Sequence, residues 1–284
     1  MEVGLGGAGD ATNVVNGEVA VVTNVSLDHA EYIGPTVADI AREKAGIVKP
    51  GATLVLGETD PVLQAPFLDR GAERVLTRGV DFGVRGNQLA HGGRIVDLFT
   101  PGATYPDVFL ALHGAHQADN AACALAAVEG FLGRPLEAGL VAGAFTVRTP
   151  GRLEVVQHQP LVLLDGVKNV AGALALRAAL AEEFADAPRT FVVGFMREKA
   201  PHEMLEALGA IGGEPRVLSP RQPAGPGARR RRARRDRARH GCRPHRGDRR
   251  RARRGPPRDR RERTGRTGRR DRVPLRREPR AMLL

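Results

Sequence analysis

The chain has 284 residues, enough for two modest domains, and a formal net charge of +12 at pH 7. The sequence contains no apolar run long enough to span a membrane and does not open on a signal-peptide pattern, so we expect a cytoplasmic protein. Its two cysteines, Cys123 and Cys242, are isolated, which excludes a disulfide framework and a metal-knuckle spacing. Residues 221–284 contain 27 arginines, no lysine and six acidic residues, a net charge of +21, whereas residues 1–220 carry −9.

A glycine-rich segment opens the sequence, and its Gly4, Gly6 and Gly9 satisfy the pattern G-x-G-x-x-G. The dinucleotide-binding fingerprint requires a strand before these glycines and a helix after them. Here a predicted strand over 18–25 follows the glycines instead. We therefore reject a Rossmann site at this place and expect a loop whose glycines adopt unusual backbone angles.

Residues 23–51 are predicted to form the end of a buried strand, a polar loop and a short helix. Thr36 is a good N-cap for that helix, and Asp39, three residues on, is the acidic half of a capping box. Gly46 and Pro50 are typical of a helix end.

Lys44 falls in the middle of the apolar face of this helix. That face is formed at amphipathic spacing by Val37, Ile40, Ala41, Ala45 and Val48. A buried ammonium is costly to desolvate, so Lys44 should be paired, deprotonated or modified. The structural alternative is that it extends past the helix end and caps the last carbonyls.

Further along, the patterns predict alternating short elements. We expect a strand over 53–56, a helix over 62–68, antiparallel strands over 75–97, and helices over 113–130 and 136–145. His113 and His116 could chelate a metal one helical turn apart, but no third ligand stands at a suitable spacing.

From residue 153 onward, strands and helices alternate. The expected strands are 153–157, 161–165, 190–194 and 216–218, and the expected helices are 171–184 and 201–208. This alternation predicts a parallel sheet with crossover helices. Asp165 stands at the carboxyl end of an apolar strand, where open α/β sheets place ligand contacts.

Residues 28–51 read D-H-x-x-x-x-G-x-T-x-x-x-I-A-x-E-K-A-G-I followed by K-P-G. This motif resembles that of the folylpolyglutamate synthase and dihydrofolate synthase branch of the Mur ligases. In that family the Asp-His loop supplies a magnesium ligand and the lysine is carbamylated. The resemblance therefore implies that His29 is a Mg²⁺ ligand and that Lys44 is the carbamylated residue.

The opening segment, E-V-G-L-G-G-x-x-D-A-T-N, is similar to another motif of the same family. The resemblance implies that Glu2 is a second Mg²⁺ ligand and that Asp10 contacts the pterin substrate. The sequence departs from the family at Ala8 and Gly9, where Arg-Leu is usual. Magnesium binds few protein oxygens together with substrate phosphates, which such a sparse ligand set allows.

Three further residues are implied in ATP binding. H-Q-x-x-N-A resembles the family segment whose asparagine binds adenine, which maps to Asn120. P-G-R resembles the hinge whose arginine reaches the ATP phosphates, which maps to Arg152; the alternative is an exposed linker charge. Asp165 matches the aspartate of the family's D-x-A-H-N-P and would contact the nucleotide. Lys168 stands where that motif has histidine, so no histidine role is carried over.

The resemblance implies an α/β fold with three parts. Residues 1–148 would be the C-terminal part of a central ATP-binding domain, 149–220 a partial Rossmann-like C-terminal domain, and 221–284 a disordered arginine-rich tail. The family's glycine-rich phosphate loop, G-T-N-G-K-G-S, is not in this sequence. We therefore expect an N-terminally truncated member.

The implied chemistry is ATP-dependent amide ligation. ATP would phosphorylate a carboxylate of folate or dihydropteroate, and the amine of L-glutamate would attack the acyl phosphate, releasing ADP and phosphate. Mg²⁺ and cationic side chains would offset charge on the transferring phosphoryl group. We expect a monomer acting on these small molecules. Without the phosphate loop, we expect no ligase activity from this chain. Mur ligases that act on cell-wall precursors are the nearest enzymatic alternative.

The arginine-rich end permits two interpretations. It could be a non-catalytic segment that binds nucleic acid non-specifically through charge. It could also be the product of a reading frame shifted in a GC-rich gene. A one-nucleotide shift across residues 271–276 can yield T-G-S-L-Y-V, which resembles the closing strand and loop of the family. We interpret the tail as mostly out of frame.

Overall fold

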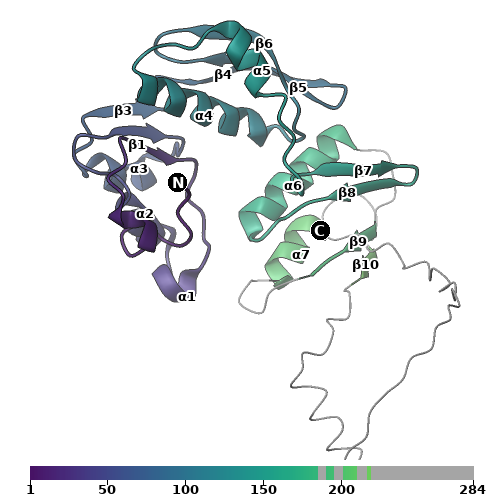
Figure 1. Ribbon diagram of the computed structural model, residues 1–284. Coiled ribbons are helices and arrows are strands. Elements are labelled where there is room, and N and C mark those ends of the chain that lie inside the picture. Colours follow the sequence, from purple (N-terminus) through teal and green to yellow (C-terminus); the bar gives the residue numbers. More distant parts are fainter. Residues whose placement is uncertain (185–189, 195–200, 210–215, 219–284) are drawn as a thin grey trace, which may run out of the picture. The chain divides into compact units, whose positions relative to one another are not determined.

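A parallel sheet of three strands organises the first part of the chain. The computed structural model describes residues 1–184, 190–194 and 201–209, together with the backbone of 216–218. The sheet has the order β1-β2-β3, formed by β1 (Val19–Val22), β2 (Thr53–Leu56) and β3 (Arg74–Thr77). The connections contain α1 (Ala30–Ile33) and α2 (Val37–Ala45) before β2, and α3 (Pro61–Leu68) before β3 (Figure 1). The arginine-rich tail and its expected disorder lie outside the described residues.

The two faces of this sheet pack against different helices. Leu54 and Leu56 are fully buried and belong to the cluster that also contains Ile40 of α2 and Phe67 of α3. Val55 points to the opposite face, into the cluster formed with α4 (His116–Leu132). Burying such a side chain stabilises the fold by roughly 1.5–3 kcal/mol. β2 is therefore the central, fully covered strand, while β1 forms one edge of the sheet.

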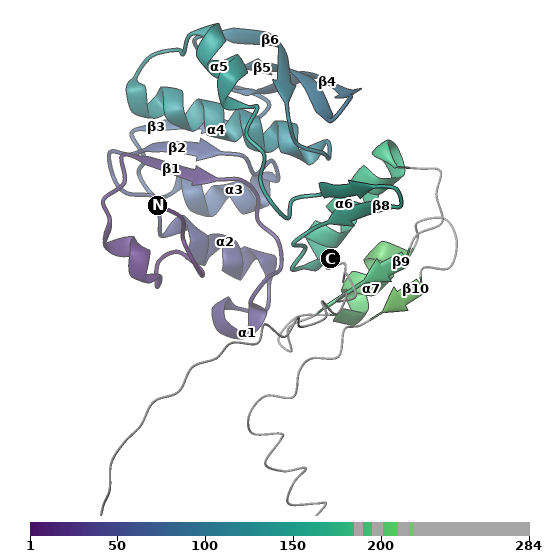
Figure 2. The same cartoon turned by 45° about the vertical axis from the view of Figure 1, so that its right-hand side comes forward.

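A second sheet lies on the far side of α4 (Figures 1 and 2). Its antiparallel strands have the order β4-β5-β6 and comprise β4 (Gly83–Ala90), β5 (Gly93–Phe99) and β6 (Thr104–Leu110). Side chains of this sheet and of α4 share one hydrophobic cluster, which includes Val96, Leu98 and Tyr105. α5 (Ala138–Ala144) packs against β6.

The prediction of antiparallel strands over 75–97 is wrong at its beginning. Residues from Arg74 to Thr77 join the parallel sheet, because the crossover through α3 returns the chain alongside β2 in the same direction. The antiparallel pairing starts only at Gly83. The sequence analysis did not predict β6, because Pro106 interrupts the alternation of apolar residues in this strand. Next to Pro106, Asp107 has φ of 54°, and the pairing register between β5 and β6 shifts there.

The later elements are two strand pairs and two helices. β7 (Glu154–His158) pairs antiparallel with β8 (Leu161–Leu164), and β9 (Thr190–Val192) pairs parallel with β10 (Arg216–Leu218). α6 (Val170–Glu183) and α7 (Pro201–Gly209) pack together over a cluster that includes Leu153 and Phe191. No helix in the described part of the chain has the length and apolarity needed to cross a lipid bilayer.

The expected parallel sheet is thus correct for β9 and β10 and wrong for β7 and β8. Only two residues separate β7 from β8, whereas a parallel crossover requires a dozen or more. A hairpin is the only pairing open to them. The alternation in the sequence indicated the strands but not their direction.

The predicted capping box at the start of α2 is confirmed. The Thr36 hydroxyl accepts from the Asp39 amide at 3.1 Å, and the Thr36 amide donates to the Asp39 carboxylate at 3.1 Å. The helix ends at Ala45 with Gly46 as its C-cap. Ile40, Ala41, Ala45 and Val48 are buried, and Lys44 on the same face is half-buried.

We predict that Thr36→Ala lowers the free energy of unfolding by about 1 kcal/mol, because the first-turn amides lose their side-chain acceptor. Urea unfolding measures the change. Thr36→Ser keeps a hydroxyl at this position and should retain most of the stability. Equal stability of the alanine and wild-type chains would show that the capping box contributes nothing.

Candidate functional site

The carboxyl ends of the three parallel strands converge on α4. A Cβ at Gly57, directly after β2, would lie 2.4 Å from the Thr23 carbonyl oxygen and 2.8 Å from Cys123 Sγ, so only glycine fits there. Arg78, after β3, donates from Nε to the Gly57 carbonyl at 2.7 Å and forms an ion pair of 2.7 Å with Asp119 of α4. Open parallel sheets bind ligands at this edge.

Glu58 is a buried carboxylate at the same edge. Its Oε2 accepts from the Val25 amide at 2.8 Å, and its Oε1 accepts from the amides of Thr59 at 2.8 Å and Asp60 at 2.9 Å. It therefore ties the loop after β1 to the turn that starts α3. Sequence reasoning missed Glu58, because a single glutamate after a strand has no local pattern that distinguishes it.

The Asp28–His29 loop contains a strained backbone. His29 has φ of 55° and occupies the N-cap of α1. A non-glycine residue in this region costs on the order of 1–3 kcal/mol, and such residues cluster at functional sites. His29 Nε2 lies 3.7 Å from Asp28 Oδ1. The loop thus has a feature expected of a ligand-binding segment, although its role as a metal site stays a prediction.

Two residues at the start of α6 lie close to Asp28. The side-chain amide of Asn169 donates to Asp28 Oδ2 at 3.3 Å, and Lys168 Nζ lies 3.9 Å from the same oxygen. Lys168 is therefore directed at the Asp-His loop. A cation at this position places positive charge beside the candidate metal site.

The glycine loop docks onto the C-terminal end of α2. The Ala8 amide donates to the Glu43 carbonyl at 2.9 Å, and the Gly9 amide donates to Glu43 Oε1 at 2.8 Å. A Cβ at Gly7 would lie 2.5 Å from the Glu43 carbonyl oxygen and 2.8 Å from Lys44 Cα. The expected unusual backbone is found at Gly6, with φ of 72°. Glu43, which the sequence analysis did not single out, thus holds the loop beside Lys44.

Asp10 organises the segment after the glycine loop. It caps the 3₁₀ helix Ala11–Val14, and it accepts from the Leu5 amide at 2.8 Å, the Thr12 amide at 2.8 Å and the Thr12 hydroxyl at 2.6 Å. These hydrogen bonds, led by that of the Thr12 hydroxyl, lower the pKa of Asp10 to about 2. Asp10 is therefore ionised at neutral pH, and its contact with a substrate stays a prediction.

Glu2 and His29, the expected Mg²⁺ ligands, and Lys44, the expected carbamylated residue, differ in their exposure to solvent. Glu2 is exposed, and both His29 and Lys44 are half-buried. Among the described residues, no group of three or more histidine, cysteine, aspartate or glutamate side chains is arranged to hold a metal ion. A site built from Glu2 and His29 would need further ligands from water or substrate.

α4 begins at His116, three residues later than predicted. Gly114, with φ of 95°, lies between His113 and the helix, and His113 Nδ1 instead lies 2.7 Å from Glu183 Oε2. The two histidines are therefore not one helical turn apart. Asn120, in the second turn, is exposed and donates to Gln117 Oε1 at 3.0 Å.

Asp165 and Arg152 lie close to each other. Asp165 Oδ2 accepts from the Leu153 amide at 2.7 Å, next to the exposed Arg152. Burial raises the pKa of Asp165, against the opposing effects of the Leu153 amide and the Arg152 charge. His116 of α4 also interacts electrostatically with both residues. The structure thus brings two predicted nucleotide contacts, Arg152 and Asp165, near the start of α4.

We predict that stability falls as pH rises from 3.8, the usual pKa of aspartate, through the higher pKa of folded Asp165. The free energy of unfolding falls with rising pH because the folded chain holds the proton of Asp165 more tightly than the unfolded chain does. Asp165→Asn should remove this part of the pH dependence of stability. Thermal unfolding of both proteins from pH 4 to pH 7 measures the difference. Parallel pH profiles would mean that Asp165 titrates normally.

The chain resembles known proteins in sequence. Residues 1–128 match the Mur ligase middle domain. The dihydrofolate synthase/folylpolyglutamate synthase of Mycobacterium tuberculosis is 39% identical over 240 residues, which cover 77% of this chain and 49% of that protein. The chain spans about half the length of the curated relatives it matches.

Solved structures of folylpolyglutamate synthases are also similar to this chain. The Mycobacterium tuberculosis folylpolyglutamate synthase complexed with ADP has a TM-score of 0.71 and 38% identity, covering 76% of this chain and 50% of that one. An FPGS-AMPPCP-folate complex has a TM-score of 0.72 and 28% identity, covering 83% of this chain and 60% of the other. Residues 1–128 thus match the Mur ligase family, and about three quarters of the chain is similar to folylpolyglutamate and dihydrofolate synthases.

Proposed function

We propose that this chain is part of an ATP-dependent amide ligase, which joins L-glutamate to a carboxylate of folate or dihydropteroate through an acyl phosphate. The relatives include folylpolyglutamate synthases solved with ADP, AMPPCP and folate. The observation that carries the proposal is the docking of the glycine loop on α2 through Glu43. It brings together two motifs that lie more than 30 residues apart and that both match this family.

Lys44 is proposed to be carbamylated. Lys44 is half-buried on an apolar helix face, and a lysine amine in its neutral form can add to carbon dioxide and release a proton. The resulting carbamate is an anion beside the glycine loop. A carbamate there would support the metal and phosphate region of the site.

Mg²⁺ is proposed to bind Glu2 and His29. One carboxylate and one imidazole are too few for a closed site, but Mg²⁺ commonly keeps several waters and takes further oxygens from substrate phosphates. When bound, it would neutralise charge that develops on the transferring phosphoryl group. The ammonium of Lys168 near Asp28 adds positive charge to the same region.

Nucleotide and substrate are proposed to contact four residues. The exposed amide of Asn120 can pair with the edge of adenine, and Arg152 can bind phosphate with its planar guanidinium. Asp165 would contact the nucleotide, and Asp10 the pterin. A cytoplasmic monomer that works on these small molecules is part of the same proposal. The alternative, nucleic-acid binding by residues 221–284, concerns a segment outside the described residues, and the relatives favour the ligase.

We predict that the chain binds Mg²⁺–ADP and that Asn120→Ala weakens binding by about tenfold, as expected for the loss of about 1.4 kcal/mol of hydrogen bonding. Calorimetric titration measures both affinities. Gln117→Ala is the matched control, because it removes the partner of Asn120 and leaves its amide available. Equal affinity of the Asn120 variant and wild type would remove Asn120 from the site.

We also predict that ¹³C-labelled bicarbonate gives a carbamate signal in the NMR spectrum and that Lys44→Arg abolishes it. Arginine keeps the charge but is not a nucleophilic amine at neutral pH. Lys49→Arg serves as the control, since Lys49 donates to Asn13 at the other side of the glycine loop. A signal that persists in Lys44→Arg would assign the carbamate to another lysine.

A further inference from the structure

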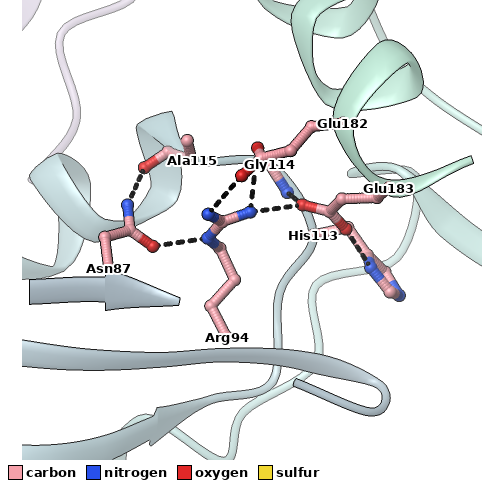
Figure 3. A network of polar contacts seen from close by, with 7 residues as sticks. All are labelled: Asn87, Arg94, His113, Gly114, Ala115, Glu182 and Glu183. Carbon is pink, nitrogen blue, oxygen red and sulfur yellow. Dashed lines mark hydrogen bonds and ion pairs between the residues drawn. The ribbon is translucent and has the colours of Figure 1, made fainter. Parts of the chain in front are cut away.

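Arg94, on β5, is a charged side chain that is only 1% exposed. Its Nε donates to Asn87 Oδ1 of β4, and its two terminal nitrogens bind Glu182 at 2.9 and 3.1 Å (Figure 3). One of these nitrogens also donates to Glu183 Oε1 at 2.7 Å. All three guanidinium nitrogens are therefore engaged, two of them with the C-terminal end of α6.

Glu183 connects Arg94 to the segment before α4. Its side chain is 4% exposed; Oε1 accepts from the Gly114 amide at 2.7 Å, and Oε2 lies 2.7 Å from His113 Nδ1. Burial alone would disfavour the carboxylate, but the hydrogen bonds from His113, Gly114 and Arg94 outweigh it and lower the pKa of Glu183. Glu183 is therefore a charged acceptor shared by three residues, Arg94 on β5 and His113 and Gly114 in the segment before α4.

Arg94 is also connected to the start of α4 through Asn87. The side-chain amide of Asn87, whose oxygen accepts from Arg94, donates to the Ala115 carbonyl at 3.0 Å (Figure 3). Ala115 is the N-cap of α4, and that helix has no side-chain cap of its own. The start of α4 is thus fixed from two sides, by Glu183 at Gly114 and by Asn87 at Ala115.

The cost of burying these charges indicates a role other than stability. Desolvating a buried ion pair opposes its attraction, and apolar side chains of similar volume often stabilise a fold as well or better. What the guanidinium supplies and an apolar side chain cannot is a fixed direction to each partner. The arrangement therefore fixes geometry between β4, β5, α6 and the start of α4.

We infer that Arg94 is a positioning residue that holds α6 against the first turn of α4 and so sets the distance between Asn120 and Asp165. Asn120 lies on α4, and Asp165 precedes α6 by five residues. At the other end of α6, Asn169 and Lys168 meet Asp28. This inference rests on the proposed function, because it concerns two residues proposed to contact the nucleotide.

Arg94→Lys tests the inference, because lysine keeps the charge but cannot bind Asn87, Glu182 and Glu183 together. We expect amide hydrogen exchange at Gly114 to accelerate by about tenfold, while amides of β2 keep their protection, and Mg²⁺–ADP to bind more weakly. Arg85→Lys is the matched control on β4, since Arg85 is exposed and stacks on Phe99. Arg85→Lys should change neither the amide exchange at Gly114 nor the affinity for Mg²⁺–ADP.

Asn87→Ala is the second variant and leaves the buried charges in place. It should accelerate exchange in the first turn of α4 and leave β2 unaffected. Unchanged exchange at Gly114 and in that turn would overturn the inference, as would equal acceleration throughout β2 and α4, which marks a purely structural role. If the wild-type chain binds no Mg²⁺–ADP, the proposed function fails, whereas the exchange pattern still decides whether Arg94 positions α4.

Discussion

The packing of α4 between two sheets is the constraint on which the rest of the structure depends. The helix can be covered on both sides because its buried positions are mostly small, namely Ala118, Ala121, Ala122 and Ala126. Larger side chains there would push the sheets apart, and overpacking of this kind typically costs about 1–3 kcal/mol. Since both sheets are packed against this helix, its first turns occupy a fixed place at the carboxyl edge of the parallel strands.

Polar contacts between distant segments then define the candidate site. Arg78 joins β3 to Asp119, Glu43 holds the glycine loop on α2, and Glu183 links α6 to the turn before α4. Each contact joins residues more than 30 positions apart. The hydrophobic clusters determine which helices and sheets pack together, whereas these charged and amide groups hold the connecting loops in place.

Local signals in the sequence were sufficient for some of these features. The capping box at Thr36, the end of α2 and the strand β2 follow from patterns within a few residues, and the structure has them as expected. The direction of β8 could have been inferred locally, because the short connection after β7 excludes a parallel crossover. The partner of His113 is Glu183, 70 positions away in the sequence, so no local pattern could have fixed it. Arg94 was missed for the same reason, because a single arginine in a strand predicts an exposed side chain. The roles of Glu2, His29 and Lys44 stay predictions drawn from resemblance.

The edge position of β1 has a practical consequence for the chain in solution. In the part of the chain that the structure describes, β1 pairs with β2 on one side only, and Val21 is 37% exposed. A row of backbone amides and carbonyls beside apolar side chains is a template for another strand. A peptide that supplies a matching strand should therefore pair with β1 along this edge.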